Sequence, residues 1–136
     1  MKEPAWKHFA YWGSLALVLA GGMALAAALP SLFTPGLDGL FFLGLFFLHM
    51  GAGHLAGYQG MLHRRYRAAP WRRDYQRALA LAYGLMGLGW MAGSLLPQGV
   101  GIYAVIFALA AGLLYSGRRL QQLRSAAPRG DLKEKE

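Results

Sequence analysis

Four long apolar stretches, separated by short polar segments, dominate the pattern of this chain. They cover residues 9–29, 37–58, 78–96 and 99–117. As helices rising 1.5 Å per residue, these stretches are long enough to cross a hydrocarbon core about 30 Å thick. The breaks within each pair are short and contain Pro30, Pro35 or Pro97. The pattern predicts an all-α, polytopic membrane protein whose four transmembrane helices form two hairpins.

The basic residues all lie on one side of these stretches. The 14 Lys and Arg precede the first stretch, join the second to the third, or follow the fourth. The other two connections contain neither residue. Because loops rich in Lys and Arg stay in the cytoplasm, we expect a multi-pass protein of the cell's inner (cytoplasmic) membrane with both termini cytoplasmic.

Length and composition limit the domain organisation, the partners and the chemistry that the chain can have. The length fits one transmembrane bundle over residues 1–124, followed by a flexible, mixed-charge cytoplasmic tail over 125–136. The net charge of +8 borders the membrane, so anionic lipid is a better partner than nucleic acid. The chain has no Cys, which excludes thiol catalysis and thiolate metal sites. Ten Arg against four Lys, with no Asn, fit a thermophile, although a GC-rich genome gives a similar bias.

Small residues recur at helical spacing and predict helix contacts. In lipid, helices associate where small side chains let their backbones approach. Ala16, Ala20, Ala24 and Ala28 form such a ridge on the first stretch. The other predicted packing residues are Gly53, Gly57, Gly89, Gly93, Ala108 and Gly112. These contacts would lie within one bundle, within a homo-oligomer or against another subunit.

His49 and His54 are the ionisable residues deep in the stretches. A buried polar side chain without a partner is costly, so each must find a hydrogen bond, a ligand or water. Helical phase places them on different faces, with His49 on the glycine face beside Gly53. The structural interpretation of His49 is a neutral ring bonded to a hydroxyl or backbone carbonyl across the interface. The functional interpretation, for either residue, is a haem ligand or a quinone contact.

Haem and copper both need ligands from elsewhere. No other stretch offers a deep histidine, so a second haem ligand would come from Met23, Met86, Met91 or another chain. Met50, His54 and Met61 suit Cu(I) by ligand type, but Met50 and Met61 are about 16 Å apart along a helix. The sequence itself requires no cofactor.

The connection between the second and third stretches concentrates arginine and aromatic residues. Pro70 suits the first turn of the third helix, placing Trp71 and Tyr75 on one face at headgroup depth. Arginine also binds phosphate and carboxylate through paired hydrogen bonds. The residues predicted to bind anionic lipid or an acidic partner are Arg64, Arg65, Arg67, Arg72, Arg73, Arg77 and Trp71.

No nucleophile with its base, phosphate loop or carboxylate pair is recognisable, so the chain is not expected to be an enzyme. The leading hypothesis is a non-catalytic accessory or assembly subunit of a larger membrane complex, with quinone-linked respiratory electron transfer as one setting. The alternatives are a small homo-oligomeric channel or copper transporter, and a b-type haem-binding membrane protein.

Overall fold

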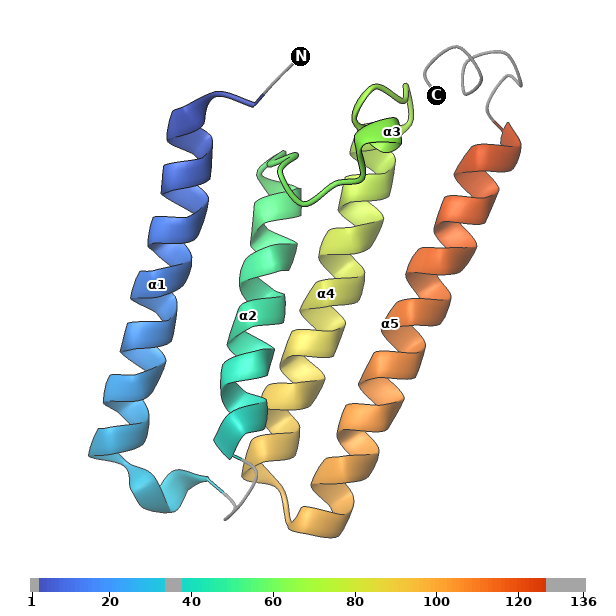
Figure 1. Ribbon diagram of the computed structural model, residues 1–136. Helices are drawn as coiled ribbons and strands as arrows, with labels where there is room; N and C mark the ends of the chain where they lie inside the picture. Colours follow the sequence, from blue (N-terminus) through green and yellow to red (C-terminus); the bar gives the residue numbers. More distant parts are fainter. Residues whose placement is uncertain (1–2, 34–37, 127–136) are drawn as a thin grey trace.

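Within residues 3–33 and 38–126, which the computed structural model describes, the chain is all-helical (Figure 1). Four of the helices are long and apolar enough to cross a membrane. The elements are α1 (Ala5–Ala28), the short 3-10 helix η1 (Pro30–Leu32), α2 (Asp38–Leu55), α3 (Arg64–Arg67), α4 (Arg72–Leu95) and α5 (Gln98–Ala126). The prediction of four helices that are long and apolar enough to cross a membrane is therefore confirmed.

The helices and the apolar stretches differ mainly at the polar ends. Helix α4 begins at Arg72, before the predicted start at residue 78, and α5 continues to Ala126, past residue 117. Arginine and glutamine favour helix as much as leucine does, so a helix can outlast its apolar part. The predicted tail lies, from residue 127 onward, outside the described residues.

Gly57 lies just after the end of α2 and is not a helix contact, contrary to its predicted packing role. It has φ +87°, and an added Cβ would meet nothing within 4 Å. Its N–H bonds the carbonyl of His54, and the Tyr58 N–H bonds the carbonyl of Gly53. This pair of bonds is the Schellman motif, in which glycine supplies the left-handed residue. The chain therefore turns away at Gly57 while its partner Gly53 stays within α2.

The long helices lie in a row in the order α1, α2, α4, α5 (Figure 1). Helix α4 packs extensively against α2 and α5, whereas α1 contacts α2 much more sparsely. Successive long helices run in opposite directions, so the start of α1, the end of α2, the start of α4 and the end of α5 share one end of the molecule. The bundle is thus an open layer with α1 and α5 at its edges.

Glycine brings the backbones of α2 and α4 together. A Cβ added to Gly44 would lie 2.7 Å from the carbonyl oxygen of Gly87, and the converse distance is also 2.7 Å. A Cβ on Gly51 would lie 3.0 Å from the carbonyl of Ala80. No larger residue fits the Gly44–Gly87 crossing without moving a backbone. Neither Gly44 nor Gly87 is among the small residues predicted from the sequence to pack.

The predicted small residues of α4 and α5 do meet. A Cβ on Gly89 would clash with the Cβ of Ala108, which is buried. A Cβ on Gly93 would lie 2.9 Å from the carbonyl oxygen of Gly101, and one on Gly112 would lie 2.6 Å from the Met86 side chain. Gly89, Gly93, Ala108 and Gly112 therefore lie where α4 and α5 approach each other.

The ridge on α1 does not pack within the described chain. Ala16, Ala20, Ala24 and Ala28 are all exposed. The buried residues of α1 are Tyr11, Leu15 and Gly22, which lie on the opposite side of the helix at about 100° per residue. Helix α1 therefore meets α2 through the other face, because that face carries the polar and aromatic side chains.

Candidate binding cavity between α1 and α2

His49 joins α2 to α1 through a backbone carbonyl. Its Nε2 lies 3.0 Å from the carbonyl oxygen of Tyr11 and 3.2 Å from the Ser14 hydroxyl. The side chain is half-buried, and its ring tilts against that of Tyr11 at a centroid distance of 4.7 Å. These contacts match the structural interpretation of His49, a ring bonded across the interface to a carbonyl and a hydroxyl.

The protons of this cluster can be assigned from its acceptor. A carbonyl oxygen only accepts, so Nε2 of His49 must carry a proton and donate it to Tyr11. The Ser14 hydroxyl donates to the same carbonyl, at 2.9 Å. Ser14 and His49 therefore do not form a nucleophile and base, although they are close, because Nε2 has no lone pair to accept the hydroxyl proton. The lone pairs of the Ser14 oxygen and of His49 Nδ1 remain as acceptors.

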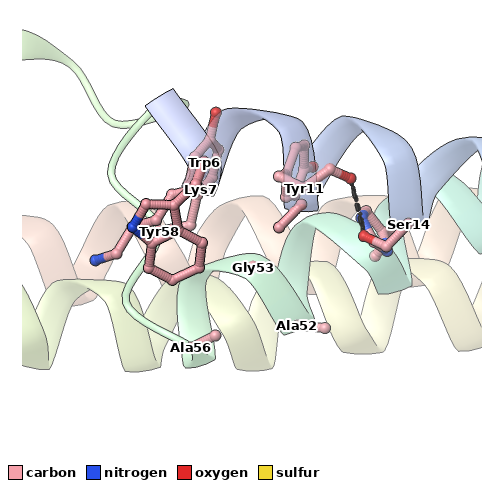
Figure 2. Close-up of a pocket in the computed structure, with 10 residues that line it drawn as sticks. Trp6, Lys7, Tyr11, Ser14, Ala52, Gly53, Ala56 and Tyr58 are labelled. Carbon is pink, nitrogen blue, oxygen red and sulfur yellow. Dashed lines mark hydrogen bonds between the residues drawn. The ribbon is translucent and has the colours of Figure 1, made fainter. Parts of the chain in front are cut away.

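A cavity of about 310 Å³ lies beside this cluster, between the first half of α1 and the second half of α2. Figure 2 shows Trp6, Lys7 and Tyr58 at one end and Ser14 at the other, with Tyr11 between them. The cavity exists because small residues line the rest of its wall, namely Ala10, Ala52, Gly53 and Ala56. The lining is mostly apolar with few polar groups, as in sites for small ligands.

Gly53 lets Tyr11 seat against α2. A Cβ at Gly53 would lie 2.7 Å from Cε2 of Tyr11. The Tyr11 ring stacks on Tyr58 at 4.5 Å and 10°, and its hydroxyl donates to the Met61 sulfur at 2.9 Å. Gly53 therefore lies at the contact between α2 and α1. If α2 continued as a helix, Tyr58 and Met61 would lie on the same face as His54. The turn at Gly57 ends the helix before them, so both side chains contact α1 instead.

The polar end of α1 is tied to the chain that follows α2. The Gln59 N–H donates to Oε1 of Glu3 at 2.6 Å, and Lys7 Nζ lies 3.5 Å from the other oxygen of that carboxylate. The Tyr58 hydroxyl lies 2.6 Å from Nδ1 of His8. Burial, together with the Glu3 carboxylate, raises the pKa of Tyr58. Its hydroxyl therefore keeps its proton beside the His8 ring.

His54 faces α4 and lies away from this cavity. Its ring is buried and stacks on Tyr83 at 5.6 Å and 6°. Its Nδ1 has no hydrogen-bond partner in the described structure. The prediction that His49 and His54 occupy different faces is confirmed.

The residues considered for haem or copper are dispersed. Met86 packs on Gly112, Met91 packs on Gly44, and Met23 is exposed. The sulfur of Met61 accepts the Tyr11 hydroxyl proton. Among residues 3–33 and 38–126, no group of three or more His, Asp or Glu could hold a metal ion. The contacts of His49 leave Nδ1, not Nε2, as its free lone pair.

The arginines of the inner connection divide into two groups. Arg67 donates from Nε to the carbonyl of Leu62 and from a terminal nitrogen to that of Gly60. Arg72 donates to the carbonyl of Arg67 at 2.9 Å. Both side chains therefore hold the loop together. The exposed members are Arg64, Arg73 and Arg77, of which Arg77 lies 4.0 Å from the Asp74 carboxylate.

Trp71 belongs to the loop core and not to a lipid-facing site. It is 7% exposed and packs on Tyr66 and Tyr75, with its Nε1 lacking a hydrogen-bond partner. The stack with Tyr75 follows the predicted spacing, but α3 folds the loop over both rings. Helix α4 begins at Arg72, so Pro70 precedes it and is not in its first turn.

Ser14, Glu3 and Gln76 are not among the residues predicted from the sequence to be functional. Gln76 is buried in α4 and donates to the Tyr58 carbonyl at 2.9 Å, which fixes the residue on which α1 stacks. The sequence feature that could have identified Gln76 is a polar amide side chain just before the third apolar stretch.

Comparison of the chain with protein-family models, with curated proteins and with solved structures finds no match.

Proposed function

We propose that this chain is a non-catalytic accessory subunit of a larger complex in the cell's inner membrane. In this proposal, the face of α1 that points away from α2 packs against helices of that complex. The observation that carries this proposal is the direction of the small-residue ridge. Ala16, Ala20 and Ala24 are exposed opposite the face that packs on α2, and a Cβ on neighbouring Gly13 would meet nothing within 4 Å.

A ridge of this kind is suited to a helix and gains little from lipid. Small side chains at four-residue spacing allow close helix approach, whereas lipid is contacted equally well by leucine or phenylalanine. The other faces of the layer carry such residues, for example the exposed Leu114 and Phe107 of α5. The described helices form an open row that cannot surround a pore, so a channel would require several copies.

The proposed orientation places both termini in the cytoplasm. The described basic residues gather at the end of the molecule that holds the start of α1 and the end of α5, which supports that orientation through the positive-inside rule. The chain has no Cys, so a single cysteine at exposed Leu32 tests it. Labelling of Leu32→Cys from the cytoplasmic side alone would contradict the orientation.

The docking test is Ala20→Leu, with Ala110→Leu on the exposed side of α5 as its matched control. Native mass measurement of the protein extracted from its own membranes should show a larger assembly that Ala20→Leu disrupts and Ala110→Leu preserves. A disulfide-linked dimer of Ala20→Cys would instead favour a homo-oligomer. A monomer of unchanged mass in both leucine variants would contradict docking.

Anionic lipid is a second proposed partner, supported by a groove beside Arg77. This cavity of about 420 Å³ lies between α2 and α4 and is otherwise lined by apolar and small residues, including Gly51, Ala80 and Gly84. Arg77 sits at the end where headgroups are expected and can meet a phosphate through charge-assisted bonds. Arg77→Gln should reduce co-purified anionic lipid in a salt-sensitive manner, while Arg118→Gln on α5 serves as the control.

A further inference from the structure

We propose that the cavity between α1 and α2 binds a quinol, the hydroquinone form of a lipid-soluble quinone. None of the ridge residues Ala16, Ala20 and Ala24 lines this cavity, which lies beside the first half of α1. The ligand class follows from the free hydrogen-bonding groups, the shape of the walls and the position of the charge.

The deep end of the cavity offers acceptors. Both donor protons of the Ser14–His49 pair point to the Tyr11 carbonyl oxygen, at 2.9 and 3.0 Å. The groups of this pair that remain available to a ligand are hydrogen-bond acceptors, namely lone pairs on the Ser14 oxygen and on His49 Nδ1. A matching ligand must therefore bring a hydroxyl or N–H donor, which a quinol has and a quinone lacks.

The walls suit a flat ring. Tyr11 and Tyr58, stacked at 4.5 Å, form an aromatic surface on one side, and Trp6 lies at the shallow end (Figure 2). Aromatic rings favour such offset-stacked neighbours. The exposed positions Ala52 and Ala56 leave the cavity open toward the surrounding bilayer, so an isoprenoid tail can extend into lipid.

Lys7 can donate a hydrogen bond to the second oxygen of the ligand. Lys7 and Ser14 are seven residues apart on α1, which is about 10.5 Å along the helix axis. A six-membered ring with oxygens at opposite ends, plus a hydrogen bond of about 2.8 Å at each, covers a similar span. The Lys7 ammonium lies 3.5 Å from Glu3 and its side chain is 38% exposed, so it still has protons to donate.

A lipid acyl chain is the competing occupant of such a space. An acyl chain fills apolar volume but donates no hydrogen bond, so it would leave the Ser14 and His49 lone pairs unmatched. A dependence of binding on the hydroxyl groups of the ligand therefore separates the two occupants.

The test measures binding of a decyl-substituted benzoquinol and of its oxidised quinone to the purified full chain in lipid nanodiscs, under argon. Tryptophan fluorescence quenching follows binding, since Trp6 borders the cavity. We expect saturable binding at one ligand per chain, about tenfold tighter for the quinol than for the quinone. Ser14→Ala should weaken quinol binding by about fivefold, the size of one neutral hydrogen bond, and leave quinone binding nearly unchanged.

Ala56→Leu and Ala80→Leu form the matched pair that locates the site. Ala56 lines this cavity and Ala80 lines the one between α2 and α4, so binding should be lost in the first variant and kept in the second. Circular dichroism of both variants verifies the fold. Absence of saturable binding, or equal binding in the two variants, overturns the proposal. Equal affinity for quinol and quinone, unaffected by Ser14→Ala, would show an acyl-chain slot and overturn it as well.

Discussion

Helix α1 and the layer formed by α2, α4 and α5 are held by different interactions. In the layer, glycines such as Gly44 and Gly87 bring backbones into contact. At α1, the interface consists of hydrogen bonds and stacked rings, centred on Tyr11, His49 and Tyr58. Since lipid is as apolar as leucine, neither interface is driven by hydrophobic burial.

The difference shows what each kind of contact provides. Where Gly44 meets Gly87, the backbones of α2 and α4 touch and leave no space between them. Side-chain contact holds α1 at separate points, and the cavity of about 310 Å³ lies between those points. The two interfaces of α2 therefore differ in kind, with close backbone contact toward α4 and separate side-chain contacts toward α1.

The largest expected effect is the loss of the layer. Gly44→Val should destabilise the fold by about 3 kcal/mol or more, because its side chain would overlap the backbone of α4. Thermal unfolding in detergent, followed by circular dichroism, measures this loss. Gly84→Val is the control, since a Cβ there meets nothing within 4 Å. Equal melting of the two variants would mean that the α2–α4 crossing is not tight.

The next effect is the release of α1 alone. Gly53→Leu should displace Tyr11 and cost about 2 kcal/mol at this interface, while α2, α4 and α5 remain packed. A cysteine replacing buried Leu15 reports the release, because maleimide labelling should accelerate once α1 leaves α2. Leu43→Ala, at an exposed position of α2, should not change the labelling rate. Slow labelling in the Gly53 variant would contradict this.

A smaller effect is expected at His49. His49→Leu should cost about 1 kcal/mol, at the low end for a lost hydrogen bond, because Ser14 still donates to Tyr11. His49→Gln should retain most of the stability, since its amide can donate to the same carbonyl. Combining His49→Leu with Ser14→Ala should cost more than the sum of the single changes. Strict additivity in unfolding measurements would show that the two donors act independently.

The smallest effect tests the turn that separates the two regions. Gly57→Ala should cost about 0.5 to 1 kcal/mol because alanine is strained at positive φ. Gly57→Asn should cost less, as asparagine tolerates the left-handed region. Unfolding curves of the two variants, measured against Gly99→Ala in open space, give the comparison. A larger loss for asparagine than for alanine would contradict the strain argument.

The predictable and unpredictable parts of the structure follow the same division. Helical period gave the four spanning helices and the separate faces of His49 and His54, since both depend on local geometry. The Gly44–Gly87 crossing depends on how two helices rotate about each other, which no single stretch records. Small residues surround α1 on most sides, so the sequence could not indicate that Tyr11 and Gly22 would pack and that Ala20 would face outward.

The candidate site between α1 and α2 was also predictable only in part. The phase of His49 pointed to a neighbouring helix, but its acceptor is a main-chain carbonyl, and any residue type at position 11 would supply one. The loop arginines show the converse. Arg67 and Arg64 have the same chemistry in the sequence, yet Arg67 binds the carbonyls of Leu62 and Gly60 because the chain reverses there.

The bonds from the start of α1 to Tyr58, Gln59 and Met61 have a consequence for the order of assembly. Chains are made from the N-terminus, so α1 leaves the ribosome before these three residues do. During that interval the anchors of α1 do not yet exist. We therefore expect α1 to remain a lone, freely rotating helix until the turn after α2 emerges, and its docking to be a late event of biogenesis.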